Sequence, residues 1–140
     1  MTKPELRIID ANLNRLGEGL RVCEDITRFC LNDKSLTKAF KSLRHREGQL
    51  KKEICLSFDI LGSRSIAADV GKDSAKSERV RNNFAEIFFA NIERAKESLR
   101  VLEEVSKLVS PKIAEGFKKI RFRIYALEKK SVPKVKSKLQ

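Results

Sequence analysis

The chain has 140 residues, 41% of them hydrophobic and 36% charged, and its 31 Lys and Arg against 19 Asp and Glu give a net charge of +12. This length predicts one domain with a real core and leaves no room for a second catalytic domain. No apolar run approaches the roughly 18 residues that cross a bilayer, and the N-terminus has neither an apolar stretch nor a cleavage site of the secretory type. We therefore expect a cytoplasmic protein that does not associate with membranes.

The first predicted element is a long helix over residues 4–31, with Pro4 in its first turn. Its apolar residues follow alternating steps of four and three, which is the helical period, and Thr27 fills one slot of that pattern. The apolar positions are Ile9, Leu13, Leu16, Leu20, Cys23 and Cys30. The three cysteines contain no CxxC pair, so we favour buried thiols.

The long helix is repeated later in the chain. "ANLNRLGEGLRVCED" opens at Ala11, and "ANIERAKESLRVLEE" opens at Ala90; the helices that follow share "FKSLRHR" from Phe40 and "FKKIRFR" from Phe117. Self-similarity at a nearly constant offset, 79 residues for the first pair and 77 for the second, marks a structural repeat. The sequence therefore predicts an all-α fold: a four-helix bundle of two hairpins, residues 4–57 and 77–130, related by an approximate two-fold axis. The third helix is expected over 77–109, and Ser110 is expected to cap the fourth.

Two segments lie outside the hairpins. The loop over residues 58–76 has no sustained period, and loops of this length in compact domains are often lids or binding loops, so we favour a functional role over mere linkage. Residues 131–140 contain Pro133 and a run of lysines. They are expected to form a basic, flexible tail, with a nucleic-acid-binding arm as the less favoured alternative because the chain has one Tyr and no Trp.

Several polar or small residues interrupt the apolar faces of the long helices. Asn12 and Asn91 fall within the apolar arcs, where each is either a structural hydrogen bonder or a ligand contact. Arg15 and Arg94 lie one turn further on and can reach a phosphate or carboxylate. The small residues Gly19 and Ser98 imply close approach by a crossing helix or, less often, a ligand. The acidic residues further along, such as Glu24, are expected toward the exposed side.

The second helix carries a cluster of ionisable residues in "LRHRE". Glu47 occupies an apolar position, so it is either buried and paired, for example with Arg44 or Arg15, or faces a cavity. His45, the only histidine, stands beside it. In the loop, Asp69 is a candidate magnesium ligand, whereas "DVGKDS" lacks the spacing of a P-loop. The cluster next to two inward asparagines is the best candidate for a chemical site.

These motifs together resemble a known family. "DANLNRLGEGLRVCED", "LRH", "DVG", "ANIERAKESLRVLEE" and "RFRIYALEK" are similar to a helical domain of thiamin biosynthesis that occurs alone or fused ahead of thiamine-phosphate synthase. The resemblance extends to about Lys129. The chain departs from that family's pattern at Ser65, where Asp is expected after Arg64.

The resemblance implies a hydroxymethylpyrimidine-phosphate kinase that uses ATP and Mg²⁺ to make the diphosphate. Its substrate would be a small pyrimidine phosphate, and thiamine-phosphate synthase and a second copy of the chain are candidate partners. The alternative is a non-catalytic helical module that binds or partners the synthase. We assign Glu47, His45 and Asp69 as candidate catalytic residues, with Asp69 also as metal ligand. The candidate substrate-binding residues are Asn12, Arg15, Gly19, Arg44, Arg64, Gly71, Asn91, Arg94 and Ser98.

Overall fold

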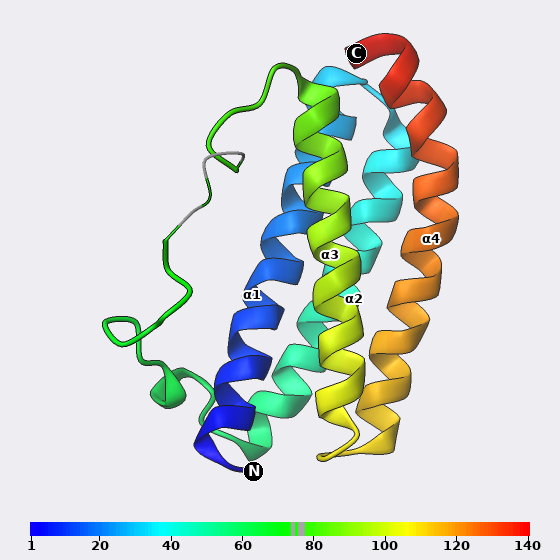
Figure 1. Ribbon diagram of the computed structural model, residues 1–140. Helices are drawn as coiled ribbons and strands as arrows, with labels where there is room; N and C mark the ends of the chain where they lie inside the picture. The colour runs from blue at the N-terminus through cyan, green and yellow to red at the C-terminus, as the bar shows by residue number, and fades with distance from the viewer. Residues whose placement is uncertain (74, 76–77) are drawn as a thin grey trace.

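The computed structural model describes residues 1–73, 75 and 78–140. All regular structure within these ranges is helical (Figure 1). The elements are α1 (Lys3–Asp25), a π-helical turn (Ile26–Cys30), α2 (Lys34–Ser57), a short 3₁₀ turn (Leu61–Ser63), α3 (Phe84–Ser106) and α4 (Pro111–Leu139). The predicted all-α fold and four-helix bundle are confirmed.

The four helices lie side by side, and each hairpin runs up and down (Figure 1). The helix α1 packs most extensively against α3, which runs antiparallel to it, and α2 packs against α4. This pairing of equivalent helices across the bundle is what an internal two-fold axis requires. None of the described helices is both long and apolar enough to cross a bilayer.

Each main helix begins at a side chain that accepts a hydrogen bond from a backbone N–H three residues on. Thr2 forms a capping box with Glu5, and Asp33 and Asn83 accept from Leu36 and Glu86. Ser110 caps α4, as predicted. These caps satisfy N–H groups that have no partner inside the helix, and they set where each helix begins.

The predicted apolar positions form the core. Those named for the first helix are all buried except Cys30, which is half-buried near the helix end. Phe40 of α2 meets Phe88 of α3 edge to face, with ring centroids 5.9 Å apart, so the two hairpins share one core. Cys23 is buried as expected, but Cys55 is exposed, because it lies on the outward face at the end of α2.

The loop between the hairpins is longer than predicted. Ser77, the expected start of the third helix, lies outside the described residues, and the helix begins only at Phe84. The physical reason is the cap: Asn83 accepts from the backbone N–H of Glu86, while the Glu86 carboxylate accepts from both the backbone and the side chain of Asn82. The connecting segment therefore runs from Phe58 to Asn83.

The C-terminal tail is also different from the prediction. Residues 131–139 continue α4 in spite of Pro133, so the expectation of a flexible tail is wrong. Ser131 and Val135 are fully buried, and the Lys134 ammonium pairs with Asp33 at the start of α2, at 2.5 Å. Burial of Val135 and this contact offset the hydrogen bond that the proline removes.

Candidate functional site

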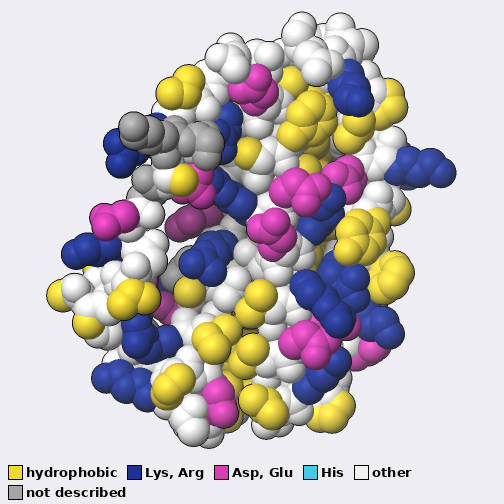
Figure 2. Space-filling view, viewed as in Figure 1, with side chains coloured by type: hydrophobic (Ala, Val, Ile, Leu, Met, Phe, Trp, Pro, Cys, Tyr) yellow, Lys and Arg dark blue, Asp and Glu magenta, His cyan; other side chains and the backbone are white. Residues whose placement is uncertain are grey.

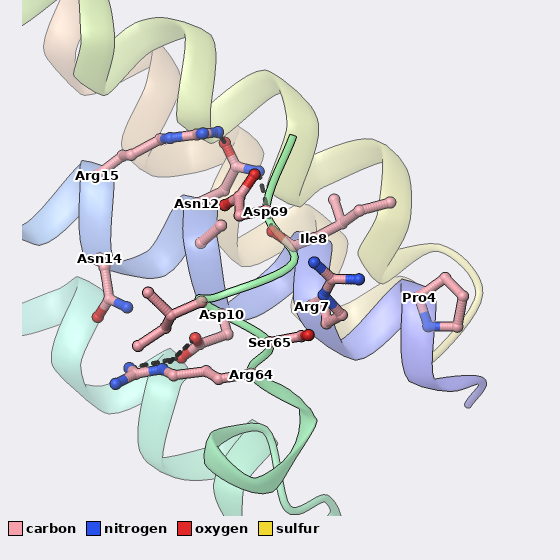
Figure 3. Close-up of a pocket in the computed structure, with 12 residues that line it drawn as sticks. Pro4, Arg7, Ile8, Asp10, Asn12, Asn14, Arg15, Arg64, Ser65 and Asp69 are labelled. Carbon is pink, nitrogen blue, oxygen red and sulfur yellow. Dashed lines mark hydrogen bonds and ion pairs between the residues drawn. The ribbon is translucent and has the colours of Figure 1, made fainter. Parts of the chain in front are cut away.

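A cavity of about 590 Å³ lies between the N-terminal half of α1 and residues 64–69 of the loop (Figure 3). Small-molecule sites have volumes of roughly 300–1,000 Å³. Figure 2 shows the surface hollowed between the loop and the bundle, with basic and acidic side chains around the hollow. The lining residues are Pro4, Arg7, Ile8, Asp10, Ala11, Asn12, Asn14, Arg15, Arg64, Ser65, Ile66 and Asp69.

The helical period explains why α1 presents so many polar groups to this cavity. Arg7, Asp10 and Asn14 are spaced by three and four residues and therefore share one face of α1. Asn12 and Arg15 lie on the adjacent face, and both faces line the cavity. The loop then supplies the opposite wall.

An ion pair joins that loop to α1. Arg64 donates from Nε to Asp10 Oδ2 at 2.5 Å and from Nη2 to Oδ1 at 2.9 Å, which is the bidentate geometry of strong arginine–carboxylate pairs. Asp10 is only 5% exposed. The hydrogen bond from Arg64 to Asp10 raises the pKa of the guanidinium. The pair fixes the start of the loop over α1 and neutralises Arg64.

The first predicted asparagine–arginine pair lies on the cavity wall. Asn12 donates from Nδ2 to the carbonyl of Ile8 at 2.9 Å, and its Oδ1 accepts a long hydrogen bond of 3.5 Å from Arg15. Asn12 thus makes the structural hydrogen bond and lines the cavity as well. Its repeat, Asn91, donates to the carbonyl of Ile87 in the same way, but neither Asn91 nor Arg94 lines the cavity.

Asp69 is the acidic group that the loop contributes. It is exposed, and its Oδ1 accepts from the backbone N–H of Gly71 at 2.9 Å, which is how Gly71 supports the site. In the described part of the chain, no three side chains of the metal-binding types cluster. A magnesium ion is often held by one or two carboxylates together with ligand phosphates, so Asp69 is compatible with that mode only.

The predicted substrate-binding role of Arg44 has a structural alternative. Arg44 donates from Nε to Glu24 Oε2 at 2.7 Å, and this bond raises the pKa of the guanidinium. Glu24 is buried, so its expected position on the exposed side is wrong; the ion pair makes its burial tolerable. The second hairpin repeats the contact, with Arg121 donating to the buried Glu103 at 2.8 Å. The charged residues that recur in the two repeats therefore hold the two helices of each hairpin together.

Glu47 and His45 also lie away from the cavity lining. His45 is exposed. Glu47 is 6% exposed and has no hydrogen bond or ion pair with the described residues, so the expected pairing with Arg44 or Arg15 is not present. Its Oε2 lies 3.8 Å from the position that a Cβ on Gly17 would take. Burial raises the pKa of Glu47, with Lys51 and Arg44 opposing the shift.

The small inward residues belong to the helix interface. A Cβ on Gly19 would lie 2.8 Å from the carbonyl oxygen of Asn91. A crossing helix, the interpretation that the sequence favoured over a ligand, therefore accounts for this glycine. Ser98, its counterpart, is buried and donates from Oγ to the carbonyl of Arg94 at 2.7 Å. Neither residue lines the cavity.

Sequence reasoning missed Arg7, Asp10 and Asn14. Their equivalents in the second half are Glu86, Phe89 and Glu93, so a search for residues that recur passes over them. One signal was available, because Asp10 is a charged residue that directly follows the apolar Ile9 at the edge of the predicted arc. The loop residue Ser65 had no signal beyond its position next to Arg64.

Comparisons with known proteins agree with these motifs. The model of the ThiD2 family matches residues 7–130. The thiamine-phosphate synthase of Rhodopirellula baltica is 39% identical over 122 residues, which are 86% of this chain and 32% of that protein. The thiamine-phosphate synthase of a Nostoc species is 40% identical over 123 residues, 87% of this chain and 34% of that protein. The chain thus spans about a third of these relatives. No solved structure matches.

Proposed function

Because the chain belongs to the ThiD2 family, we propose that it acts in thiamin biosynthesis as a kinase that converts hydroxymethylpyrimidine phosphate to its diphosphate with ATP. The observation that carries the proposal is the cavity between α1 and the loop. It brings the guanidinium groups of Arg7 and Arg15, which have no carboxylate partner within the described residues, together with the carboxylate of Asp69, beside the Arg64–Asp10 pair. This is a donor set suited to phosphates and their metal ion.

Phosphoryl transfer suits a site of this kind, because it depends mainly on positioned charges and exclusion of water. In the proposed reaction an oxygen of the pyrimidine's phosphate group attacks the γ-phosphorus of ATP, the bond from that phosphorus to the bridging oxygen breaks, and ADP leaves, which gives the diphosphate. Arg15 would bind phosphate oxygens, and Asp69 would hold the magnesium ion that neutralises charge on the nucleotide phosphates. Arg64, held by Asp10, would keep the loop over the reactants.

The cavity also offers surfaces for a flat ring. The side chains of Ile8 and Ile66 line it and are 42% and 75% exposed, so apolar surface there remains to be covered. Asn14 lines it too and has no hydrogen bond within the described ranges, which leaves its amide for the donor and acceptor edge of an aminopyrimidine. Asn14 is better placed for this role than Asn91.

The direct test incubates the purified protein with hydroxymethylpyrimidine phosphate, ATP and Mg²⁺ and follows the diphosphate by ³¹P NMR. We expect wild-type turnover and a loss of about 100-fold in Arg15→Ala, with an unchanged melting temperature. Arg28→Ala is the matched control, because Arg28 is exposed and stacks on Phe29, away from the cavity. Absence of the diphosphate with wild-type protein would refute the kinase.

A second candidate function is a non-catalytic module that partners thiamine-phosphate synthase. The observation in its favour is that the relatives bearing that name are about three times as long as their shared region. This candidate predicts that the chain co-elutes with a synthase on size-exclusion chromatography and binds the pyrimidine phosphate without turning it over. Turnover by the chain alone, with no co-elution, would exclude it.

A further inference from the structure

We infer that Arg7 and Arg15 anchor two different phosphorylated ligands, one at each end of the cavity. The inference rests on the proposed function and adds to it a residue, Arg7, and a division of the cavity into two phosphate subsites. Its basis is the way in which the charges of the cavity are already paired.

The cavity contains three arginines, but only two of them are available to a ligand. Arg64 is held by both oxygens of Asp10. Arg7 has no hydrogen-bond or ion-pair partner within the described ranges, and Arg15 makes only its 3.5 Å contact with the neutral amide of Asn12. A guanidinium on a cavity wall without a carboxylate partner is suited to bind an anion from solution.

The two available arginines leave α1 at well-separated positions. Arg15 lies eight positions after Arg7, which corresponds to about 12 Å along the helix axis. Asp10, with Arg64 bound to it, lies between them in the sequence of α1 and on the same cavity. Figure 3 shows Arg7 and Arg15 on separate turns of α1, with Asp69 between them in this view.

The second half of the chain lacks this arrangement. Arg94 repeats Arg15, but Glu86 replaces Arg7, and its carboxylate is occupied by Asn82 at the start of α3. Hydrogen bonds from the side chain and the backbone of Asn82 lower the pKa of Glu86, so this position carries negative charge. Only the first repeat can therefore offer two phosphate subsites, which predicts one composite site in the chain.

The test is to titrate each ligand separately, by calorimetry, into the wild type, Arg7→Gln and Arg15→Gln. The ligands are a non-hydrolysable ATP analogue with Mg²⁺ and hydroxymethylpyrimidine phosphate. Each variant should raise the Kd of one ligand about tenfold, a different ligand for each variant, since a hydrogen bond to a charged group contributes about that much. Arg28→Gln is the charge-matched control and should change neither Kd.

Three results would overturn the inference: both variants raise the Kd of the same ligand, neither variant raises the Kd of either ligand, or the wild type binds neither ligand. Because the measurement needs no turnover, it is independent of the kinase assay. A protein that makes no diphosphate but shows one ligand per arginine retains the two subsites and loses the proposed function. A protein that makes the diphosphate but does not show one ligand per arginine retains the proposed function and loses the two subsites. Thermal melts of each variant exclude unfolding as the cause.

Discussion

Replacing Gly19 with alanine should destabilise the bundle, whereas the same change at Gly48 should stabilise it. Both glycines lie inside long helices, where alanine is favoured over glycine by about 1 kcal/mol. At Gly48 nothing lies within 4 Å of the added Cβ, so the full gain is expected. At Gly19 the added Cβ would lie 2.8 Å from the carbonyl oxygen of Asn91, a backbone atom of α3.

That contact must be relieved by moving α1 away from α3. Such overpacking costs about 1–3 kcal/mol, which exceeds the gain in helix propensity over most of that range. We expect Gly19→Ala to lower the free energy of unfolding by about 1 kcal/mol. Gly48→Ala should raise it by a similar amount. The two variants should therefore differ by about 2 kcal/mol, or about 6 °C in melting temperature.

Urea unfolding followed by circular dichroism measures both variants against the wild type, and equal m values would show that the transitions are comparable. Gly17→Ala is a further control, because its Cβ would meet Glu47 only at 3.8 Å, an ordinary contact. If Gly19→Ala were as stable as Gly48→Ala, the close crossing of α1 and α3 at this point would be refuted.

Four further substitutions test the ion pairs and the buried acid. Asp10→Asn should speed tryptic cleavage within residues 58–83, measured by mass spectrometry, because it weakens the bidentate contact that holds the loop; an unchanged rate would contradict that role. Glu47→Gln should be more stable than the wild type at pH 7 and equal to it near pH 4. Burial raises the pKa of this carboxyl in the folded state, so the folded protein binds more protons and loses stability as pH rises above about 4.5; urea melts at both pH values decide. Glu103→Gln should cost about 3 kcal/mol in the same melts and Glu24→Gln less, because the arginine partner of the first is 14% exposed and that of the second 32%. The reverse order would refute this reasoning.

The helices and the core could be predicted because they depend on local periodicity. Steps of three and four along residues 4–31 place Leu13 and Leu20 inward whatever the partner helix, and the repeat supplies the second hairpin. The start of α3 was harder to predict from the sequence, since it depends on the capping contacts of Asn83 and Glu86. The helical C-terminus depends on the burial of Val135. Helical periodicity does not predict that burial, because Pro133 interrupts the pattern.

The candidate site was only partly predictable, for a related reason. Asn12, Arg15, Arg64 and Asp69 do line one cavity, although nothing in the spacing of the chain could show that the loop lies over α1. The Arg64–Asp10 pair that holds it there spans 54 residues. Glu24 was placed on the wrong side because its partner comes from another helix, and a buried carboxylate needs that partner.

Residues that recur between the two halves of the chain therefore differ in role from residues that do not. Residues that recur, such as Glu24 with its equivalent Glu103, hold α1 to α2 and α3 to α4 by the same ion pair, so their recurrence reflects folding. Residues that do not recur, Arg7 and Asp10, line the cavity beneath the loop beside the recurring Asn12 and Arg15, and they are what distinguishes this face of α1 from its copy in α3. A duplicated bundle needs its symmetric residues for assembly, and only a departure from symmetry can make one end of it different from the other. The non-recurring residues of α1 are accordingly the first ones to mutate in a search for function.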